Sequence, residues 1–361
     1  MKVLFLEPYP IEGPSSRYRV EQYIPFLKAN GIDCTVRPFV SSHFYRILYT
    51  KGHFIQKLFF FITSSFRRLR DLYAALQADI VFIHLEAFPI GPPLFEYLIA
   101  LLGKKIIYDF DDAIYLGNTS PTNSFLKKLK CPGKVKHIIR LSRHVITCNP
   151  HLHNYAKQFN TNVTILFTSV DTEKFFPLTK TPSDTPLRIG WIGSHSTAVY
   201  LDSIKNCLAR LSQTYNFTVT IVGASNHPFD IPGIEIRKID WSLQDEVRQF
   251  QALDIGIYPL SNNEWAFGKG GFKAIQYMSV GIPCVVSGIG VNKDIIIDGI
   301  NGFLAVTEDA WFQKLSQLIN DPGLRERIGL QGRKSVLENY SLEINAPRLL
   351  QIIKDTINNS K

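Results

Sequence analysis

The sequence contains little cysteine, and its cysteines form no pattern that would organise a site. Five cysteines are scattered over 361 residues, with no CxxC motif and no Cys/His pair at metal-ligand spacing. This distribution excludes a disulfide framework and indicates no zinc site. We expect every cysteine to be a buried apolar side chain: Cys34, Cys131, Cys148, Cys207 and Cys284.

Long hydrophobic runs are missing as well. Lys2 leads directly into "VLFLE" and then to Pro8 and Pro10, without the apolar core and small-residue cleavage site of a signal peptide. The longest unbroken apolar run between residues 43 and 70, "LFFFI", is too short to span a bilayer. The sequence therefore favours a cytoplasmic protein.

Acidic residues are absent from two stretches of the first half, 43–70 and 113–170, and the excess behind the formal net charge of +9 lies there. Residues 43–70 mix basic with large apolar side chains, which is typical of segments in the headgroup region of an anionic membrane. We therefore expect an anionic membrane surface as a partner, on the inner face of the cell membrane. An ordinary core helix with a solvated basic face is the open alternative. Nucleic acid is not an expected partner, because the sequence has no helix-turn-helix, RNP-type or zinc-finger motif.

Apolar residues are plentiful, at 45% of the chain, which is more than one ordinary core requires. Predicted strands alternate with predicted helices, which favours an α/β fold with parallel sheets covered by helices. The predicted buried strands are 2–7, 79–84, 105–110, 144–148, 163–167, 187–193, 217–223, 234–239, 254–260, 283–287 and 302–305.

A helix is predicted over residues 17–30, with Val20, Tyr23, Ile24 and Leu27 on one face before a glycine C-cap at position 31.

Residues 172–187 are rich in Pro, Thr and Ser and are predicted to be an interdomain linker. The linker would separate a first domain, 1–171, from a second, 188–340. Residues 341–361 are predicted to form a helix that crosses back to the first domain.

In open parallel sheets ligands bind beyond the carboxyl ends of the strands, so we expect a cleft between the two domains and chemistry in strand-end loops. The first such loop is "GSHSTAVYLD", where Gly193 allows a tight turn and Ser194 and His195 offer donors at a helix N-terminus, as for an anion. A simple Ser/Thr capping turn is the alternative.

The second loop, "GKGGFK", combines glycines that permit close backbone approach with two positive charges, Lys269 and Lys273, ahead of a helix N-terminus. The alternative is a solvated glycine turn with surface lysines. A third glycine-containing loop, with Asn292, follows the next strand. Several loops suited to bind anions in one domain suggest that the ligand is a diphosphate with attached groups.

Collinear motifs carry a family resemblance over nearly the whole chain. They are "EGPSSRYRVEQYIPFL", "YDFDDAIY", "VTILFTSVDTEKFFP", "GWIGSHSTAVYLD", "VTIVGAS", "IPGIEIRKIDWS", "LDIGIYPL" and "WAFGKGGFKAIQYMSVGIPCVVSGIGVNKDIIIDGINGFLA". In this order they resemble the retaining glycosyltransferases of family 4, as found in bacterial surface-polysaccharide biosynthesis. The resemblance implies the GT-B fold, in which two Rossmann-like parallel-sheet domains face each other across a cleft.

The resemblance also implies an activity. A hexose-type sugar would move from a UDP- or GDP-linked donor to a hydroxyl of a glycan or lipid-linked glycan, with retention of configuration and without a metal ion or other cofactor. A front-face route is implied, in which the leaving phosphate takes the acceptor proton while domain closure excludes water.

Donor-binding residues are implied in the second domain, and the acceptor would bind to the first. The implied donor residues are Gly193, Ser194, His195, Gly223, Trp241, Lys269, Gly270, Gly271, Phe272, Lys273 and Gln276.

This chain departs from the family pattern twice. The first loop lacks the usual Arg and Lys pair, and the two family glutamates correspond to Gly268 and Gln276. We infer that Lys269, with Lys273, replaces the missing cations, because a diphosphate in a water-poor cleft needs compensating charge. Gln276 retains an amide that can hydrogen-bond to ribose hydroxyls.

Acidic residues in "YDFDDAIY" form the DxD spacing of a metal site in another glycosyltransferase fold, but here they end a strand of the first of two domains. The resemblance places Asp111 where the family often has His. It implies catalytic roles for Asp109, Asp111 and Lys269, with Asp112 also near acceptor hydroxyls. For Asp112 the alternative is a helix cap.

Further acceptor-binding residues are implied at the ends of the first and preceding strands. They are Gly13, Ser15, Ser16, Arg17, His84 and Glu86. A helix cap by Ser15 or Ser16 and a core role for His84 are the alternatives.

Two other functions remain open on the sequence. One is a nucleotide-sugar epimerase or another non-transferring enzyme with the same two domains. The other is a catalytically weak glycan-binding protein, suggested by the missing glutamate pair.

Overall fold

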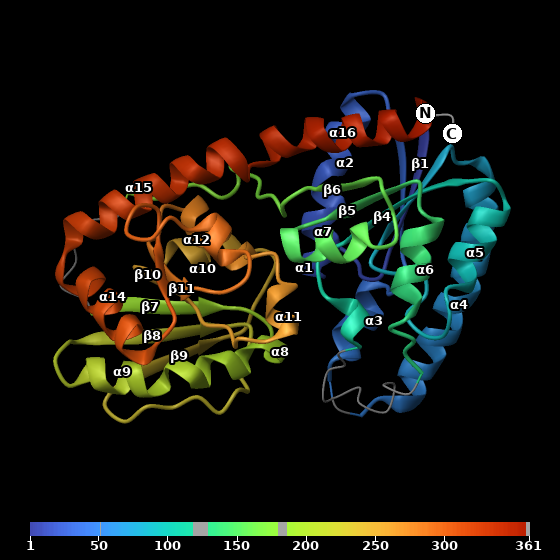
Figure 1. Cartoon of the computed structure of the whole chain (residues 1–361). Coiled ribbons are helices and arrows are strands. Elements are labelled where there is room, and N and C mark those ends of the chain that lie inside the picture. Colours follow the sequence, from blue (N-terminus) through green and yellow to red (C-terminus); the bar gives the residue numbers. More distant parts are fainter. Residues whose placement is uncertain (51, 118–128, 180–185, 359–361) are drawn as a thin grey trace. The chain divides into compact units, whose positions relative to one another are not determined.

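A computed structural model describes residues 1–50, 52–117, 129–179 and 186–358. The chain divides into two compact units, Met1–Ser169 with Leu342–Lys361, and Val170–Ser341 (Figure 1). Each unit contains one six-stranded sheet in which the paired strands are parallel. The α/β class predicted from the alternating pattern is confirmed.

The first unit has the strand order β2-β1-β3-β4-β5-β6. Its strands are β1 (Lys2–Glu7), β2 (Asp33–Pro38), β3 (Ile80–His84), β4 (Lys105–Phe110), β5 (His144–Thr147) and β6 (Val163–Ile165). The register of β3 and β4 pairs His84 with Asp109, so two residues that are distant in sequence become neighbours at one edge of the sheet.

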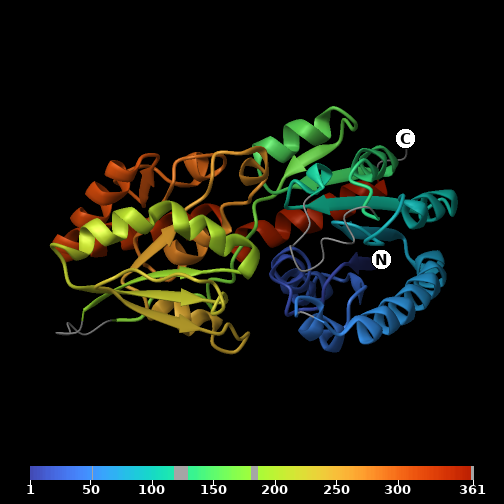
Figure 2. The ribbon, with the colours of Figure 1, turned by 90° about the horizontal axis from the view of Figure 1, so that it is seen from below.

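Helices cover both faces of this sheet (Figure 2). They are α1 (Pro14–Arg19), α2 (Ile24–Ala29), α3 (Ser42–Leu48), α4 (Phe54–Gln77), α5 (Leu94–Leu101), α6 (Lys134–Leu141), α7 (Pro150–Lys157) and α16 (Leu342–Asn358), with short 3₁₀ turns η1 (Glu21–Tyr23) and η2 (Ile114–Leu116). Leu349 and Ile353 of α16 are buried in the same core as Phe5 and Ile107.

The helix predicted over 17–30 is interrupted. Residues 14–29 form α1, η1 and α2 in succession, and Pro25 lies in the first turn of α2. Proline has no N–H to donate to the preceding turn, which favours a new helix start at this position over a continuous helix. The predicted apolar face is nevertheless buried in one core: Val20, Tyr23, Ile24 and Leu27.

The second unit has the strand order β12-β11-β10-β7-β8-β9. Its strands are β7 (Leu187–Ile192), β8 (Phe217–Val222), β9 (Glu235–Ile239), β10 (Ile255–Tyr258), β11 (Cys284–Ser287) and β12 (Phe303–Ala305). Its helices are α8 (His195–Ala198), η4 (Val199–Ile204), α9 (Lys205–Ser212), α10 (Glu246–Gln251), α11 (Glu264–Phe267), α12 (Phe272–Ser279), α13 (Asn292–Ile295), α14 (Glu308–Asn320) and α15 (Pro322–Asn339).

The second unit begins at Val170, so the described part of the predicted linker packs as part of this unit. The Phe175 ring lies 6.0 Å from that of Phe250, and Arg333 Nη2 donates to the Thr172 carbonyl over 2.9 Å. Residues 180–185 of the predicted linker lie outside the described residues.

All five cysteines carry free thiols, and four are buried as predicted, whereas Cys131 is partly exposed. Across the described ranges, no group of three or more His, Cys, Asp or Glu side chains is arranged to hold a metal ion. In the same ranges, none of the helices combines the length and apolar character that crossing a membrane requires.

One buried carboxyl at the end of β1 makes the stability of the first unit sensitive to pH. Glu7 is fully buried, and burial, reinforced by the negative charge of Glu21, raises its pKa to about 9. The Glu7 side chain is therefore neutral at pH 7.

We predict that Glu7→Gln stabilises the protein at neutral and mildly alkaline pH. A carboxyl whose pKa is higher in the folded than in the unfolded state stabilises the fold fully below its unfolded pKa, and this contribution is lost as pH rises towards the folded pKa. Between about pH 5 and 8, this effect lowers the wild-type unfolding free energy by up to about 1.4 kcal/mol per pH unit, a slope that Gln removes. Urea unfolding across this range tests it, and parallel pH profiles for the two proteins would contradict it.

Candidate active site

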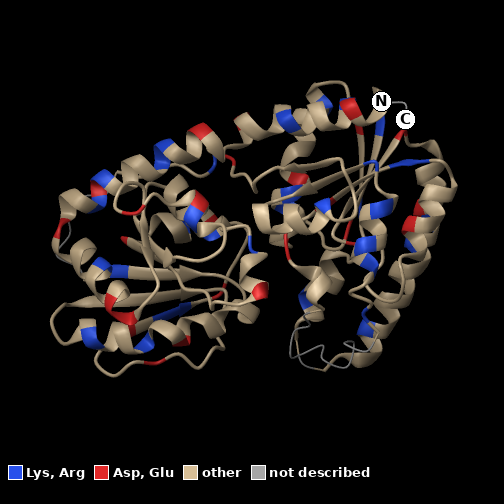
Figure 3. Ribbon diagram, viewed as in Figure 1, with Lys and Arg blue, Asp and Glu red and all other residues tan. Residues whose placement is uncertain are grey.

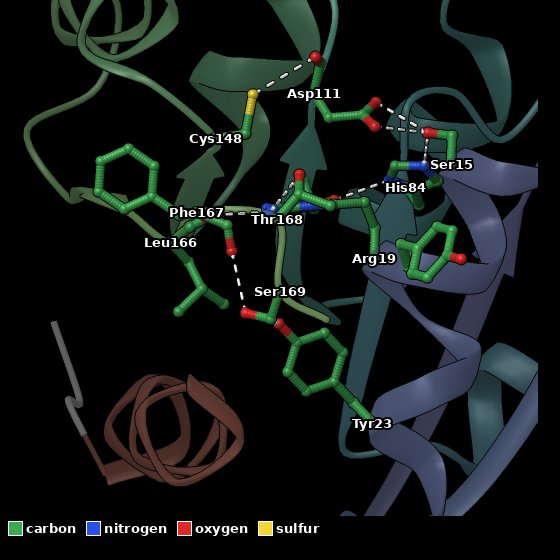
Figure 4. Close-up of polar contacts among 12 residues, drawn as sticks. Ser15, Arg19, Tyr23, His84, Asp111, Cys148, Leu166, Phe167, Thr168 and Ser169 are labelled. Carbon is green, nitrogen blue, oxygen red and sulfur yellow. Dashed lines mark hydrogen bonds and ion pairs between the residues drawn. The ribbon is translucent and has the colours of Figure 1, made fainter. Parts of the chain in front are cut away.

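Four polar side chains of the first unit meet at the carboxyl edge of its sheet (Figure 4). Ser15 Oγ lies 2.7 Å from His84 Nε2 and 2.8 Å from each carboxylate oxygen of Asp111. His84 Nδ1 lies 2.7 Å from Asp109 Oδ2. The parallel strands bring His84 and Asp109 to this edge, and α1, which follows β1, adds Ser15.

Arg19 anchors this group from the next turn of α1. Its Nε donates to Asp109 Oδ2 over 3.2 Å, and its Nη2 donates to the other oxygen of the same carboxylate. Its Nη1 donates to the Leu166 carbonyl over 2.6 Å. Both side chains of the ion pair are 1% exposed.

The charge of Asp109 is fixed by these contacts. Burial alone would raise its pKa, but the positive charge of Arg19 and the hydrogen bond from His84 outweigh burial and lower the pKa below its ordinary value. Asp109 is therefore a carboxylate throughout the neutral range and requires a donor at His84 Nδ1.

The Ser15 hydroxyl links the other two side chains at this edge. It donates to the Asp111 carboxylate, and its oxygen lies 2.7 Å from His84 Nε2. Ser15 therefore holds the Asp111 carboxylate beside the His84 ring.

Two proposed capping roles at this edge are wrong. Gly13, not a serine, occupies the N-cap of α1, and no side chain caps that helix, so neither Ser15 nor Ser16 acts as its cap. Ala113 occupies the N-cap of η2, again without a side-chain cap, so Asp112 does not serve there.

The remaining predicted acceptor residues have structural contacts of their own. Ser16 is buried, and its hydroxyl accepts from the Tyr9 N–H over 3.4 Å. Arg17 Nη1 donates to the Ile11 carbonyl over 2.8 Å and so braces the loop before α1. Glu86 is paired with Lys134 over 2.7 Å.

In the second unit, the loops after β7 and β8 meet closely. Gly193 N–H donates to the Val222 carbonyl over 3.0 Å, and Gly223 N–H donates to the Ile239 carbonyl over 2.9 Å. Gly223 has a φ of +85°, and a Cβ at this position would collide with the Gly193 carbonyl oxygen and lie 3.3 Å from Trp241 Cβ. Only glycine fits here, and the structure brings Gly193, Gly223 and Trp241 together.

Lys273, in the first turn of α12, packs against the loop that contains Gly193. Its Nζ is 5.0 Å from the centre of the Tyr258 ring and 5.6 Å from that of Trp191, and a Cβ at Gly193 would lie 2.8 Å from its Cε. Lys269 lies in the turn before α12, with its Nζ 5.0 Å from the centre of the Trp265 ring. Lys273 is therefore the lysine that contacts the Gly193 loop.

The turn into α12 also contacts the third predicted loop. Gly271, at the N-cap of α12, has a φ of +65°, and a Cβ there would lie 3.2 Å from Asn292 Oδ1. Asn292 is buried and donates its amide to the Ser287 carbonyl over 2.9 Å. Gln276 is buried within α12.

Other predicted donor residues lie near these loops. Ser194 occupies the N-cap of α8 without a side-chain cap, and its hydroxyl lies 2.9 Å from that of Ser196. His195 is exposed, whereas Gly270 and Phe272 are partly buried beside Gly271.

Some residues of the site were not predicted. The main one is Arg19. Its signal in the sequence is its spacing from Ser15, because residues four apart in a helix share one face and can belong to the same site. Trp191 and Tyr258, whose rings flank Lys273, end neighbouring strands β7 and β10.

We predict that Arg19→Met lowers the unfolding free energy by about 3 to 5 kcal/mol, because it leaves the Asp109 carboxylate buried without its ionic partner. Arg237→Met is the matched control, since the Arg237–Glu235 pair is about half exposed on both sides and its loss should change stability little. Urea unfolding at neutral pH measures both, and equal effects of the two substitutions would contradict the role of Arg19.

Comparisons with known proteins give a family match in the second unit. Residues 186–321, which lie in the second unit, match the family described as Glycosyl transferases group 1. A capsular polysaccharide biosynthesis glycosyltransferase of Staphylococcus aureus, CapM, is 27% identical over 104 residues. That match covers 28% of this chain and only about a quarter, 26%, of CapM.

Solved structures resemble the chain over nearly its whole length. A glycosyltransferase from Rickettsia africae has 19% identity and a TM-score of 0.71, with 99% of each chain covered. HepE from Anabaena, solved in complex with UDP-glucose, has 14% identity and a TM-score of 0.71, with 98% of this chain and 100% of HepE covered. The second unit thus matches the glycosyl transferases group 1 family, and the chain has the predicted GT-B fold of two Rossmann-like domains.

Proposed function

We propose that this protein is a glycosyltransferase that moves a hexose-type sugar from a UDP- or GDP-linked donor to a hydroxyl of a glycan or lipid-linked glycan, with retention of configuration and without a metal ion. The observation that carries the proposal is the close approach of Gly193, Gly223 and the Lys273 side chain in the second unit, with Gly271 at the N-cap of the helix that bears Lys273. Close backbone approach and positive charge at one place suit the diphosphate of a nucleotide sugar.

The donor part of the proposal rests on charge. Cleavage of the sugar-diphosphate bond leaves negative charge on the departing phosphate, which Lys273, Lys269 and the N-terminus of α12 would stabilise. The Trp191 and Tyr258 rings hold the Lys273 ammonium in place beforehand. Gln276 would hydrogen-bond to the ribose through its amide. HepE, solved with UDP-glucose, supports a uridine nucleotide as the first donor to try.

The acceptor part rests on the first unit. Asp111 would accept a hydrogen bond from an acceptor or sugar hydroxyl, with Ser15 and His84 holding the carboxylate in position. In the proposed front-face reaction, the acceptor oxygen bonds to the anomeric carbon, the bond from that carbon to the diphosphate breaks, and the leaving phosphate takes the acceptor proton.

The cellular setting is also part of the proposal. CapM is a capsular polysaccharide biosynthesis enzyme, which supports a role in surface-polysaccharide assembly. Such a role suits a cytoplasmic enzyme held peripherally at the inner face of the cell membrane, with an anionic membrane surface as its partner at residues 43–70.

A screen of UDP- and GDP-sugars against glycan and lipid-linked acceptors tests the proposal. Transfer of the sugar with the donor's anomeric configuration is the expected result. An epimerised free nucleotide sugar would instead indicate the non-transferring enzyme. Absence of saturable binding to any uridine or guanosine diphosphate species would leave only a glycan-binding protein.

We predict that Lys269→Ala and Lys273→Ala each weaken binding of the preferred nucleoside diphosphate roughly 10- to 100-fold, because each removes one charge-assisted contact. Lys334→Ala is the control, since Lys334 is exposed on α15 with its Nζ 4.0 Å from Glu338. Isothermal titration calorimetry measures the three affinities. Unchanged affinity in either test variant would remove that lysine from the diphosphate site.

We predict that Asp111→Asn lowers kcat/KM for the acceptor by roughly 10- to 100-fold, the value of one charge-assisted hydrogen bond, while nucleotide affinity stays constant. The exposed Asp79, changed to Asn, serves as the control in the same unit. Equal loss of nucleotide affinity and of acceptor turnover in Asp111→Asn would contradict an acceptor role.

A further inference from the structure

The outer side of α4 carries a continuous stripe of large apolar side chains that face solvent. Seven positions, alternately four and three residues apart, are exposed by between 45% and 86% of their surface. They are Ile55, Phe59, Ile62, Phe66, Leu69, Tyr73 and Leu76. At about 1.5 Å per residue, the 24 residues of α4 extend the stripe along a helix of about 36 Å.

The opposite side of α4 is firmly packed, which fixes the stripe outward. Phe60 stacks on Phe44 with ring centres 5.6 Å apart, and Phe61 lies 5.7 Å from Phe39. Arg68, 1% exposed, donates to the carbonyls of Arg37 and Glu7 over 3.1 Å each. The helix is therefore apolar on both sides, but within the described ranges only one side packs against other elements.

A neighbouring helix widens this apolar surface. Leu94, Leu98 and Leu101 on α5 are exposed by 60%, 43% and 81%. The two helices are joined through Phe88, whose ring lies 5.7 Å from that of Phe61 on α4 and stacks at 5.2 Å on that of Phe95 on α5. We call the exposed stripe of α4 and these three leucines of α5 the apolar face.

A shallow apolar hollow adjoins the apolar face at Leu94. Its lining residues are Phe88, Ile90, Pro92, Leu94, Phe95 and Leu129. Contiguous apolar surface of this extent marks an interaction site on a soluble domain.

Charge around the apolar face has one sign. Arg70 lies on α4 next to the stripe and Arg67 is exposed further round the same helix, whereas Lys57 donates to the Thr50 carbonyl over 2.6 Å. The ribbon of α4 between Lys57 and Arg67 is uncharged (Figure 3). In α4 and α5, both of which are described throughout, the acidic residues are Asp71 and Glu96. Asp71 is paired with Arg68 and has a side chain only 14% exposed, and Glu96 is buried. The exposed charges on these two helices are therefore basic.

Two occupants fit a stripe of this spacing: a second copy of the chain, in a helix pair, or a lipid surface. A helix pair is stabilised by opposite charges beside its seam, but the positions that flank the stripe include no acidic residue. They are Gln56, Thr63, Arg70 and Gln77 on one side and Leu58, Ser65 and Leu72 on the other. Self-pairing would add basic side chains without acidic partners. Basic residues beside a Phe- and Leu-rich stripe match instead a helix that lies in the plane of an anionic membrane.

We propose that the apolar face docks the protein on an anionic lipid bilayer, with α4 parallel to the membrane plane and its stripe at the boundary between headgroups and acyl chains. The packing and exposure of α4 and α5 carry this inference independently of catalysis, and it rests on the proposed function only where it explains access to a lipid-linked acceptor. The proposal combines the two alternatives given above for residues 43–70: the inner side of α4 packs in the protein core, and its outer side contacts lipid.

Vesicle co-sedimentation of the full chain tests the proposal, with phosphatidylcholine vesicles that contain or lack phosphatidylglycerol. We predict binding to the anionic vesicles and at least roughly 100-fold weaker binding of Ile62→Gln/Phe66→Gln/Leu69→Gln, since apolar burial drives interfacial binding. Arg67→Gln/Arg70→Gln should weaken binding roughly 10- to 30-fold through lost attraction to the anionic headgroups.

Leu330→Gln/Leu337→Gln/Ile344→Gln is the matched control, because these helix side chains are exposed by 62%, 44% and 45% outside the apolar face. Wild-type binding by this control supports the proposal. Equal binding to neutral vesicles, or no vesicle binding together with a dimer that the Ile62/Phe66/Leu69 variant dissociates, would overturn it. Calorimetric titration with UDP and GDP separates the two proposals. A triple variant that still binds nucleotide but no longer binds vesicles has lost docking alone. A wild-type protein that binds vesicles but neither nucleotide would contradict the proposed function and leave the docking proposal intact.

Discussion

The carboxyl edge of the first unit's sheet depends on one buried ion pair. Taking the Asp109 carboxylate out of water is costly, and Arg19 compensates this cost with two hydrogen bonds while also holding the Leu166 carbonyl. Because Asp109 stays charged, it orients the His84 ring, and His84 in turn contacts Ser15. The arrangement of polar side chains at this edge is therefore set by a buried charge.

In the second unit, glycines allow the strand-end loops to pack closely. Gly223 and Gly271 adopt backbone angles that favour glycine, and their neighbours leave no room for a side chain. The loops after β7 and β8 can then approach each other closely, and the Lys273 side chain packs beside Gly193. In the proposed donor site, Lys273 on α12 and Lys269 in the turn before it would supply the positive charge that the first loop lacks.

Much of the fold could be predicted from the sequence, because buried parallel strands appear as short β-branched runs. Strand β2 was missed because it is an edge strand, where the exposed Asp33 and Arg37 interrupt the apolar pattern. Pro25 marks the break in the first helix, but burial of Tyr23 and Leu27 follows the helical period on both sides of it.

The sites were harder to predict than the fold. Glycine and lysine patterns indicate the second-unit loops, and strand ends indicate His84 and Asp109. Arg19 could not be assigned, because its partner lies 90 positions away in the sequence and pairs with it only once the sheet has formed. The orientation of Lys273 likewise depends on aromatic rings from two other strands.

Helix α16 has a consequence for the order in which the molecule is made. Leu349 and Ile353 complete a core whose other members, such as Phe5 and Ile107, precede the whole second unit in the sequence. During translation, the second unit therefore emerges while the first still exposes apolar surface that α16 later covers. The first unit cannot reach its native core until α16 has left the ribosome, so the unit that begins synthesis is the one that finishes folding last.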